Sequence, residues 1–473
     1  MITLINKNVK KIQDLYQDTT DLITRKIKLT SNEIIYLLYL ESICSSSAIN
    51  DFILKNLTNN SNIKDLNKII AAPNTTIITN PEQIEFYINN AFTIIIYKNR
   101  IYAIETKGEL SRGISEPNSE NSINGPKDSF TENIQINLGL IKRRIKSNTL
   151  SNDDYMIGRK TNTKVSLLYF KDLAKKETID IIKNKLDKID IDGLIDSSEL
   201  ANMLEDEEKV HLPLTQSTER PDNVVNALLE GKIAIIVDNS PFVLILPAFL
   251  TDFINPTSDN YNKNVNINFI RILRFFCFFF AVTVPGIYIS LINYNQETIP
   301  TNLLYNFSIQ RSGVPFPAVA EALIMLIVCE ILNESDLRFP SSYGSAISIL
   351  GALILGEAAV NAGIVSPIMI IVISITFITS LMFPEKDMNS AIRFYRFIFL
   401  FCAAFLGIIG MVYAFIFLMI RLISLKSYNE PYFFPIIPFD KVYFEKSVRK
   451  KEKINDLKRS KLLTKNIRKG INK

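Results

Sequence analysis

The stretch FFCFFFAVTVPGIYISLI, residues 275–292, contains no charged side chain. A second uncharged stretch, FIFLFCAAFLGIIGMVYAFIFLMI, covers residues 397–420. An α-helix rises about 1.5 Å per residue, so roughly 20 apolar residues cross a hydrocarbon core of about 30 Å. Both stretches are long enough for this, and the sequence therefore predicts a helical membrane domain in the second half of the chain.

The first half of the chain has the pattern of a soluble protein. Hydrophobic residues make up 47% of the 473 residues, but they are unevenly distributed. Most long uncharged runs lie after residue 268. The first 30 residues contain no apolar signal segment, so we expect the N-terminal region to stay in the cytoplasm. The cysteines are far apart in sequence and predict neither a disulfide framework nor a metal site; they are Cys44, Cys277, Cys329 and Cys402.

We expect an α/β fold for this soluble region, in two subdomains. The first covers residues 1–110, and within it the runs 91–97 and 101–106 flank turn residues and predict a β-hairpin. A polar linker follows at 111–127. The second subdomain covers residues 128–250, and a connector near the membrane surface covers residues 251–268.

Alternating strand and helix patterns define the second subdomain. Ser129 and Glu132 match a capping box at the start of a helix over 129–147. The other expected elements are a strand at 164–170, helices at 177–186 and 197–204, and a hairpin of 233–237 with 242–246. This alternation is typical of an α/β domain.

The membrane domain, residues 269–425, has five hydrophobic segments: 269–293, 317–333, 344–363, 364–383 and 393–425. Five crossings would place the tail, residues 426–473, on the opposite side from the N-terminal region. The tail carries twelve Lys or Arg between Lys446 and Lys473, which favours a cytoplasmic position against anionic lipid rather than nucleic acid. We therefore expect one segment to be re-entrant, and the proline-bounded segment 317–333 is the candidate.

Polar side chains within these apolar segments predict an ion path. An ionisable group at bilayer depth is costly and survives mainly beside water, a partner charge or a translocated ion. Glu357 and Asn361 are four residues apart and project from neighbouring turns of one helix face. Several copies packed around an axis would form a ring of the kind that admits cations. The candidates for this path are Glu321, Glu330, Glu357, Val360 and Asn361.

An alternative interpretation of Glu357 stays open, in which the carboxyl is protonated or pairs with Arg311, Arg338 or another subunit. The same helix has a face of small residues, which lets a second helix approach closely. These residues are Gly344, Ser348, Ala352, Gly356, Ala359 and Gly363.

Patterns of catalysis and cofactor binding are missing from the sequence. His211 is the single histidine and lies in a charged stretch, which favours a surface position. Gly231-Lys232 lacks the preceding glycine and the following Ser or Thr of a phosphate-binding loop. We therefore predict neither an enzyme nor a cofactor.

Several blocks together resemble the A subunit of GerA-type spore germination receptors over about residues 125–440. They are GPKDSFTEN at 125–133, ERPD at 219–222, the run 229–247, GVPFP at 313–317, and Phe339-Pro340 followed by EAAVNAGIVSP at 357–367. The positions that carry the resemblance include Ser129, Phe130, Glu132, Asn133, Arg220, Pro221, Asp222, Asp238, Pro315 and Pro317.

The resemblance implies a multi-pass protein of the spore inner membrane that acts in a germinant receptor. Its implied partners are a transporter-like B subunit that binds the nutrient and a C-subunit lipoprotein. It also implies a homo-oligomer that forms a nutrient-gated channel for monovalent cations. Glu357 departs from the family, in which this position is commonly a neutral amide. The competing hypothesis is a receptor or scaffold subunit that transmits a signal without conducting ions.

Overall fold

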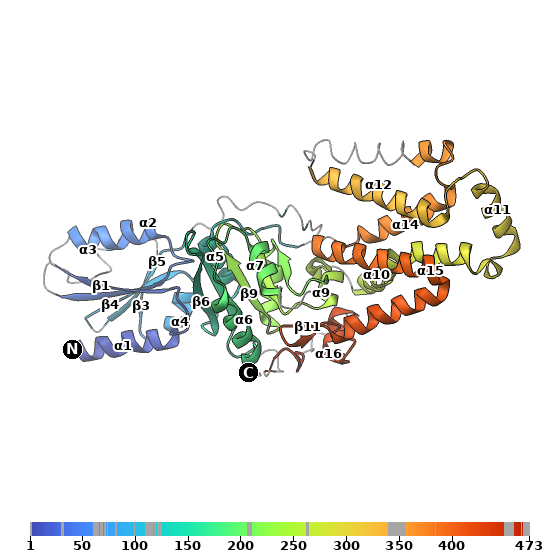
Figure 1. The fold of residues 1–473 in the computed structure, drawn as a ribbon. Helices are drawn as coiled ribbons and strands as arrows, with labels where there is room; N and C mark the ends of the chain where they lie inside the picture. Colours follow the sequence, from blue (N-terminus) through green and yellow to red (C-terminus); the bar gives the residue numbers. More distant parts are fainter. Residues whose placement is uncertain are drawn as a thin grey trace.

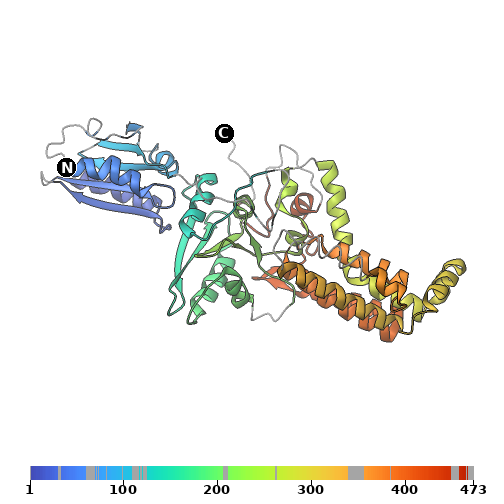
Figure 2. The same cartoon turned by 90° about the horizontal axis from the view of Figure 1, so that it is seen from above.

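The computed structural model describes residues 2–29, 33–59, 66, 70, 72, 74–80, 83–98, 100–108, 117, 120, 125–205, 211–261, 264–338, 356–383, 385–448, 458–464 and 466. Two α/β units and a helical region follow one another along the molecule, with the N-terminal unit at one end (Figures 1 and 2). The last described residues lie beside the second α/β unit rather than at the far end of the helices (Figure 1).

The first α/β unit is built on an antiparallel sheet with strand order β1-β2-β4-β5-β3. Its strands are β1 Leu22–Lys28, β2 Ile34–Leu40, β3 Thr75–Ile78, β4 Phe92–Tyr97 and β5 Arg100–Glu105, and its helices are α1 Ile2–Leu15, α2 Ser46–Ala48, α3 Lys55–Asn59 and α4 Gln83–Asn89. The predicted hairpin is confirmed, because β4 pairs with β5 across a turn that closes with Tyr97 opposite Arg100.

The second α/β unit repeats the strand order of the first. Its antiparallel sheet has the order β6-β7-β9-β10-β8. The strands are β6 Leu150–Ile157, β7 Thr163–Phe170, β8 Gln216–Thr218, β9 Ile233–Val237 and β10 Val243–Leu246, and the helices are α5 Ile134–Arg144, α6 Lys176–Lys188, α7 Ser197–Glu205 and α8 Pro221–Leu229. The α/β class predicted for the N-terminal region is confirmed, and the two units share one topology.

Alternation along the strands gives the second unit three layers. Ile235 faces the core that contains α6 and α7, whereas its neighbour Ile236 faces the core that contains α5 and α8. Successive side chains of a strand point to opposite faces, so an almost wholly apolar strand such as β9 fits a sheet that is covered on both sides.

The predicted capping box at the start of α5 is wrong. The helix begins at Ile134, and its N-cap is Asn133, whose side chain accepts hydrogen bonds from the backbone N of Gln135 and Ile136. Ser129 lies outside the helix and donates to the backbone oxygen of Glu219 at 3.3 Å. An asparagine is as good an N-cap as a serine, and here it lies next to the first helical residue.

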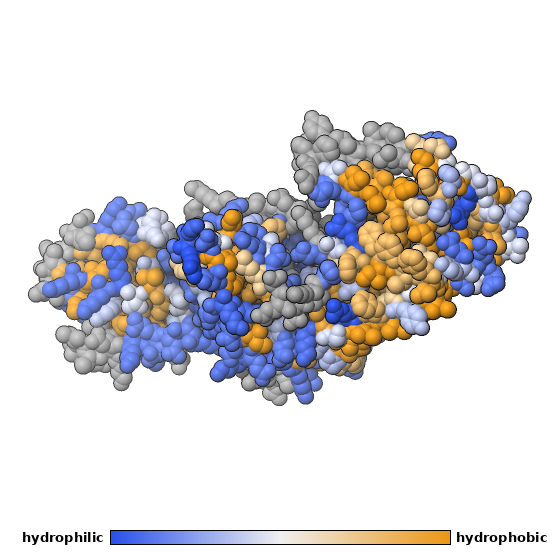
Figure 3. Space-filling model, viewed as in Figure 1, coloured by the Kyte–Doolittle hydropathy of each residue, from blue (hydrophilic) through white to orange (hydrophobic). Residues whose placement is uncertain are grey.

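The helical region begins after α9 Leu250–Ile254 and the 3-10 helix η4 Thr257–Tyr261. It contains α10 Asn264–Asn293, η5 Gln296–Thr298, α11 Thr301–Arg311, α12 Ala318–Arg338, a helical stretch at 356–361, α14 Pro367–Ser380 and α15 Lys386–Ser424. Two helical stretches are long and apolar enough to cross a membrane, Ile267–Asn293 and Asp387–Ser424. Hydrophobic side chains cover much of the visible surface of this region, in contrast to the α/β units (Figure 3).

Helix α15 reverses direction at Gly407. Segment 393–425, which we expected to be one hydrophobic segment, therefore consists of two helical arms. Gly407 has φ 61° and ψ −138°, a backbone conformation outside the helical region. Both arms pack on α10, since a Cβ added at Gly286 would lie 3.2 Å from the backbone oxygen of Phe399 and 2.6 Å from Met411 Sδ. At the tip, Tyr294 Oη donates to the backbone oxygen of Ala404 at 2.6 Å. Figure 1 shows the two arms as a hairpin.

The expectation that 317–333 is re-entrant stays a prediction, although the helix in this segment is not broken. Helix α12 runs without a break for 21 residues, which at about 1.5 Å per residue spans roughly 31 Å. Glu321 lies near one end of α12 beside Ser366, and Glu330 contacts Arg393 on the first arm of α15. The reversal at Gly407 divides segment 393–425 into two arms, whereas α12 is continuous.

After α15 the chain returns to the second α/β unit. Ser427 Oγ donates to the backbone oxygen of Leu214 at 2.8 Å and accepts from the backbone N of Ala248 at 3.1 Å. The described part of the basic tail, which includes α16 Lys441–Ser447, packs on the same unit: Lys446 pairs with Glu230, and Arg459 Nε donates to Leu229. These two tail residues contact protein, where we expected a position along the lipid surface.

Candidate functional site at the junction of the α/β and helical regions

Two sequence blocks that are 90 residues apart meet at the edge of the second α/β unit. The backbone N of Phe130 donates to the backbone oxygen of Glu219 at 2.8 Å, and Arg220 Nη2 donates to the backbone oxygen of Pro126 at 3.2 Å. The predicted positions Ser129 and Phe130 are both buried. The blocks GPKDSFTEN and ERPD are thus brought together by the fold.

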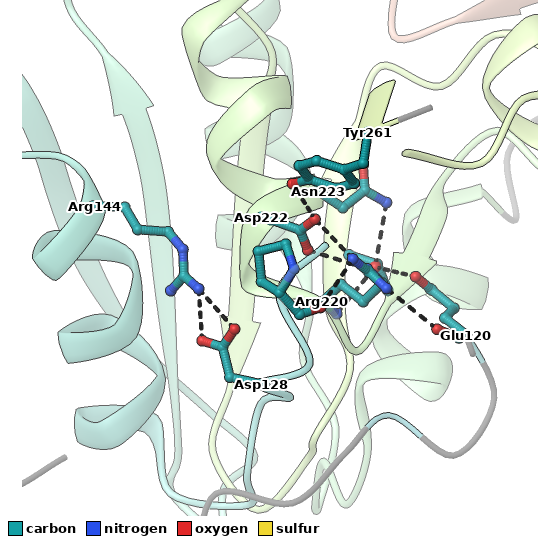
Figure 4. A network of polar contacts seen from close by, with 9 residues as sticks. Glu120, Asp128, Arg144, Arg220, Asp222, Asn223 and Tyr261 are labelled. Carbon is teal, nitrogen blue, oxygen red and sulfur yellow. Dashed lines mark hydrogen bonds and ion pairs between the residues drawn. The ribbon is translucent and has the colours of Figure 1, made fainter. Parts of the chain in front are cut away.

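A buried ion pair forms the centre of this junction (Figure 4). Arg220 Nε and Nη2 donate to the two carboxylate oxygens of Asp222 at 3.1 and 2.8 Å. Tyr261, in η4 just before α10, donates its hydroxyl to Asp222 Oδ2 at 2.6 Å. Burial and this hydrogen bond raise the pKa of Tyr261. The pair therefore ties the second α/β unit to the chain that leads into the helical region.

Position 125, beside this network, requires a glycine for two reasons: its backbone conformation and the nearby ring of Tyr261. Its φ is +112°, and an added Cβ would lie 2.6 Å from a ring carbon of Tyr261. No L-residue with a side chain fits there without displacing the ring. Glu120 completes the network, because its carboxylate accepts from Thr218 Oγ1 at 2.9 Å and its backbone oxygen from Arg220.

The remaining predicted positions of the second unit hold its elements together. Asp238 Oδ1 accepts from the backbone N of Ile134, and the backbone oxygen of Glu132 accepts from Asn239 N at 2.8 Å. These two bonds join the start of α5 to the β9–β10 turn. Pro221 occupies the first turn of α8, where a missing N–H costs nothing.

A cavity of about 630 Å³ lies next to this network, between the second α/β unit and the helical region. We call it the junction cavity. Its wall includes Glu205 of α7, Gln216 of β8 and Phe253 of α9, together with Leu381 and Glu385 from the connection between α14 and α15. Burial, and secondarily the charge of Asp387, raise the pKa of Glu205 to about 7.

The predicted ion-path acids do not lie in one place. Glu321 is fully buried and accepts hydrogen bonds from the backbone N and Oγ of Ser366 at 3.0 and 2.8 Å. Glu330 is half-buried and pairs with Arg393 at 2.7 Å, with Arg396 at 4.0 Å. Both carboxylates therefore have positive partners in the same chain, Arg311 in the case of Glu321.

Glu357 and Asn361 are exposed on the helical stretch 356–361, and Val360 is half-buried. The pairing of Glu357 with Arg311 is not formed, because Arg311 contacts Glu321 at 3.4 Å. Ala359 packs against the apolar core.

The small-residue face of this helix is described only in part. Gly356 and Gly363 belong to the described residues, and a Cβ added at Gly363 would lie 3.0 Å from the backbone oxygen of Gly313. Gly344, Ser348 and Ala352, with the block at 339–340, lie outside the described residues. Pro315 precedes α12, and the backbone oxygen of Pro317 accepts from the N of Glu321 in its first turn.

Sequence reasoning missed Tyr261 and Ser366 as partners of predicted residues, considered Arg311 for Glu357 rather than for Glu321, and missed the junction cavity. Tyr261 has an ordinary side chain, and no local pattern marks it. Ser366 precedes Pro367, and this order is a signal for the start of a helix.

The comparisons with known proteins match most of the length of the chain. The family model described as Bacillus/Clostridium GerA spore germination protein matches residues 10–461. Spore germination protein KA of Bacillus subtilis (strain 168) is 35% identical over 444 residues, which cover 92% of this chain and 82% of that protein. Spore germination protein A1 of the same organism is 33% identical over 438 residues, covering 91% and 90%.

The chain is also similar to a membrane protein and to a solved domain. The protein named uncharacterized membrane protein YfkQ of Bacillus subtilis (strain 168) is 34% identical over 443 residues, covering 92% of this chain and 86% of that protein. The crystal structure of the N-terminal domain of the A subunit of the Bacillus megaterium spore germinant receptor GerK3 is 28% identical, with a TM-score of 0.40; it covers 52% of this chain and 95% of that chain.

These matches place the chain in the class of spore germination proteins of the A-subunit type. The chain belongs to the GerA family. The resemblance derived from the sequence blocks is thereby confirmed.

Proposed function

We propose that this protein is the A-type subunit of a nutrient germinant receptor in the spore inner membrane, and that several copies assemble around a path for monovalent cations. The observation that carries the proposal is the GerA family match over residues 10–461, joined to a helical region with two membrane-length apolar stretches. The partners that the family implies are the transporter-like B subunit, which binds the nutrient, and the C-subunit lipoprotein.

The course of the chain supports an arrangement with both ends on one side of the membrane. Helix α10 leads away from the second α/β unit, and the second arm of α15 returns to it, where Ser427 contacts Leu214. A chain that leaves and returns to the same side crosses an even number of times. The cytoplasmic placement of the α/β units and the tail then agrees with the excess of basic residues in the tail.

The exposed polar face at 356–361 supports an oligomer. In a single protomer Glu357 and Asn361 are exposed, and in a membrane this position would set a carboxylate against lipid at high cost. Neighbouring copies would replace the lipid with a shared aqueous path. Glu321 and Glu330 are less suited to line such a path because each is paired with arginine.

Ion flux through the purified receptor complex in liposomes tests the proposal. Addition of germinant should release K⁺ or Na⁺, and Glu357→Gln should change conductance or selectivity. Glu297→Gln, which neutralises an exposed acid outside α10 and α11, serves as the matched control and should leave both unchanged. An intact complex that passes no ions would refute the conducting role.

The non-conducting receptor or scaffold is the second candidate, favoured by the pairing of two of the three acids within one chain. Asn361→Cys separates the two functions. A water-soluble thiol reagent should modify this cysteine and block flux if the helix lines an aqueous path. A thiol that stays unmodified in the assembled complex would support helix packing instead.

A further inference from the structure

A short apolar loop on the surface follows the second arm of α15. It covers residues 436–439, with the sequence Ile-Ile-Pro-Phe, and lies between β12 Glu430–Pro431 and α16. Ile437 and Phe439 are 41% and 67% exposed, and the proline between them is exposed as well. Neighbouring apolar side chains on a protein surface mark a site of contact with another protein or with a membrane. We call residues 436–439 the apolar loop.

Arg271 fixes the position of α16, and so of the apolar loop, along the helical region. Arg271 Nη1 donates to the backbone oxygen of Lys446, near the end of α16, at 2.6 Å. Phe269 and Ile272, which flank Arg271 on α10, are exposed apolar residues. All three belong to the first turns of the apolar stretch Ile267–Asn293. Helix α16 therefore lies beside the beginning of a membrane-length helix, which is the level of the lipid headgroups.

Exposed basic side chains lie at the same end of the helical region. They are Arg421 in the last turn of α15, Lys426 just after this helix, and Lys441 at the first residue of α16. The backbone N of Tyr432 donates to the backbone oxygen of Leu425 at 3.0 Å, which brings the chain back to the end of α15 before the apolar loop begins. Cationic groups beside apolar and aromatic side chains are typical of a surface that binds anionic lipid.

The apolar loop is also connected to the core of the second α/β unit. Phe434, two residues before the loop, and Tyr443 of α16 form a buried cluster with Phe249 and Leu463. The ring centroids of Phe249 and Phe434 are 5.1 Å apart. A surface that holds the apolar loop therefore also holds the second α/β unit, through packed side chains.

We infer that the apolar loop inserts Ile437 and Phe439 into the cytoplasmic leaflet of the membrane, with Lys441 at the anionic headgroups. Segments of this kind bury their apolar side chains about 5–10 Å into the boundary between headgroups and acyl chains. A lipid surface is favoured over a protein partner because the loop lies at the level where the exposed apolar surface of α10 begins. The insertion sets the height and orientation of the second α/β unit at the bilayer. The inference rests on the membrane placement of the helical region under the proposed function, and it is independent of ion conduction.

A single tryptophan tests the insertion. The chain has no native tryptophan, so Phe439→Trp gives one fluorescent reporter in the full-length protein. The protein is held in nanodiscs of phosphatidylcholine and phosphatidylglycerol whose acyl chains are brominated either near the carbonyl groups or near the methyl ends. The reporter should emit at short wavelength and lose more intensity to the bromines near the carbonyl groups. An emission that neither lipid quenches would overturn the inference, and if it also stayed at short wavelength it would assign the loop to a protein contact.

Two further single tryptophans separate the insertion of the loop from the membrane placement of the helices. Phe86→Trp lies at an exposed position of α4 in the first α/β unit and should not be quenched by either lipid. Phe401→Trp lies at an exposed position of the first arm of α15 and should be quenched most by the bromines near the methyl ends. Quenching in Phe401→Trp without quenching in Phe439→Trp would overturn the insertion alone, whereas no quenching in either would also refute the membrane placement.

A charge reversal tests the contact with the headgroups. Lys441→Glu places a carboxylate at the first residue of α16, where the helix dipole favours it, so α16 should still form. Quenching of the Phe439→Trp reporter should then fall in nanodiscs that contain phosphatidylglycerol and stay the same in phosphatidylcholine alone. Lys176→Glu is the matched control, because it makes the same change at the exposed first residue of α6, and it should alter neither value. Unchanged quenching for Lys441→Glu in the anionic nanodiscs would contradict the position assigned to Lys441.

Discussion

The carboxylate of Glu321, on α12, accepts two hydrogen bonds from Ser366 at the start of α14, one from the backbone N at 3.0 Å and one from Oγ at 2.8 Å. The first amides of a helix have no acceptor within the helix, and a negative charge there is favoured by the helix dipole. The other oxygen of Glu321 lies 3.4 Å from Arg311 Nη2. One buried side chain thus joins α12, α14 and the end of α11.

We expect Glu321→Ala to destabilise the helical region by about 3 kcal/mol, because it leaves the Arg311 charge and the Ser366 N–H without their partner. Thermal unfolding in detergent, followed by circular dichroism, measures the change. Glu357→Ala removes a carboxylate of the same type from an exposed position and should unfold near the native temperature. Equal losses in the two variants would show that the contact with Ser366 contributes little.

The hairpin at Gly407 makes a geometric prediction. Ser390 and Ser424 lie on the two arms of α15, and in a straight helix two residues 34 positions apart would be about 51 Å from each other. Spin labels at these positions, with the four native cysteines replaced by alanine, should be far closer than this in nanodiscs. A measured separation near the straight-helix value would disprove the reversal.

Substitution of Gly407 tests the same reversal through the stability of the protein. Its φ is +61°, and an added Cβ would lie 2.8 Å from the Tyr294 ring. Gly407→Ala should therefore cost stability by about 1–3 kcal/mol and lengthen the distance between the labels. Gly313→Ala is the control, because a Cβ at Gly313 has no heavy atom within 4 Å among those described.

The α/β class and the hairpins were predictable because strand alternation and turn residues are local signals, as in 91–106 and 233–246. The reversal at Gly407 was not, since a glycine inside an uninterrupted apolar run has the same pattern whether the helix continues or turns back. The partners of Asp222 and Glu321 were hidden for another reason. Tyr261 and Ser366 lie about 40 residues away in sequence, and only the packed fold brings them near.

A lysine in place of Arg220 should not be able to maintain the pair with Asp222. Arg220 uses its planar fork to hold both oxygens of Asp222 and also reaches Pro126, and a lysine ammonium cannot make these contacts together. Arg220→Lys should destabilise the attachment of η4 to the second unit by about 1–3 kcal/mol. Faster hydrogen exchange in residues 257–261 would report this.

A second lysine substitution controls for the loss of an arginine–carboxylate pair as such. Arg144 Nη2 donates to both oxygens of Asp128 at 2.7 Å, but this pair is partly exposed. Arg144→Lys should leave exchange at 257–261 unchanged and cost less stability, because solvent screens the pair. If both variants loosened η4 equally, the network of Figure 4 would not be the specific link between the units.

The protonation of Glu205 gives the second unit a defined response to pH. Burial, and secondarily the charge of Asp387, raise its pKa from 4.5 to about 7, so between these values the folded state binds more protons than the unfolded state. Stability must then fall as the pH rises through this window and level off above it. We expect amide exchange in α7, corrected for its intrinsic rate, to show opening that becomes easier from pH 5 to pH 7. Glu205→Gln, which stays neutral and can still accept from Leu214 N, should remove most of this dependence, whereas an unchanged pH profile in the variant would assign the effect to another group.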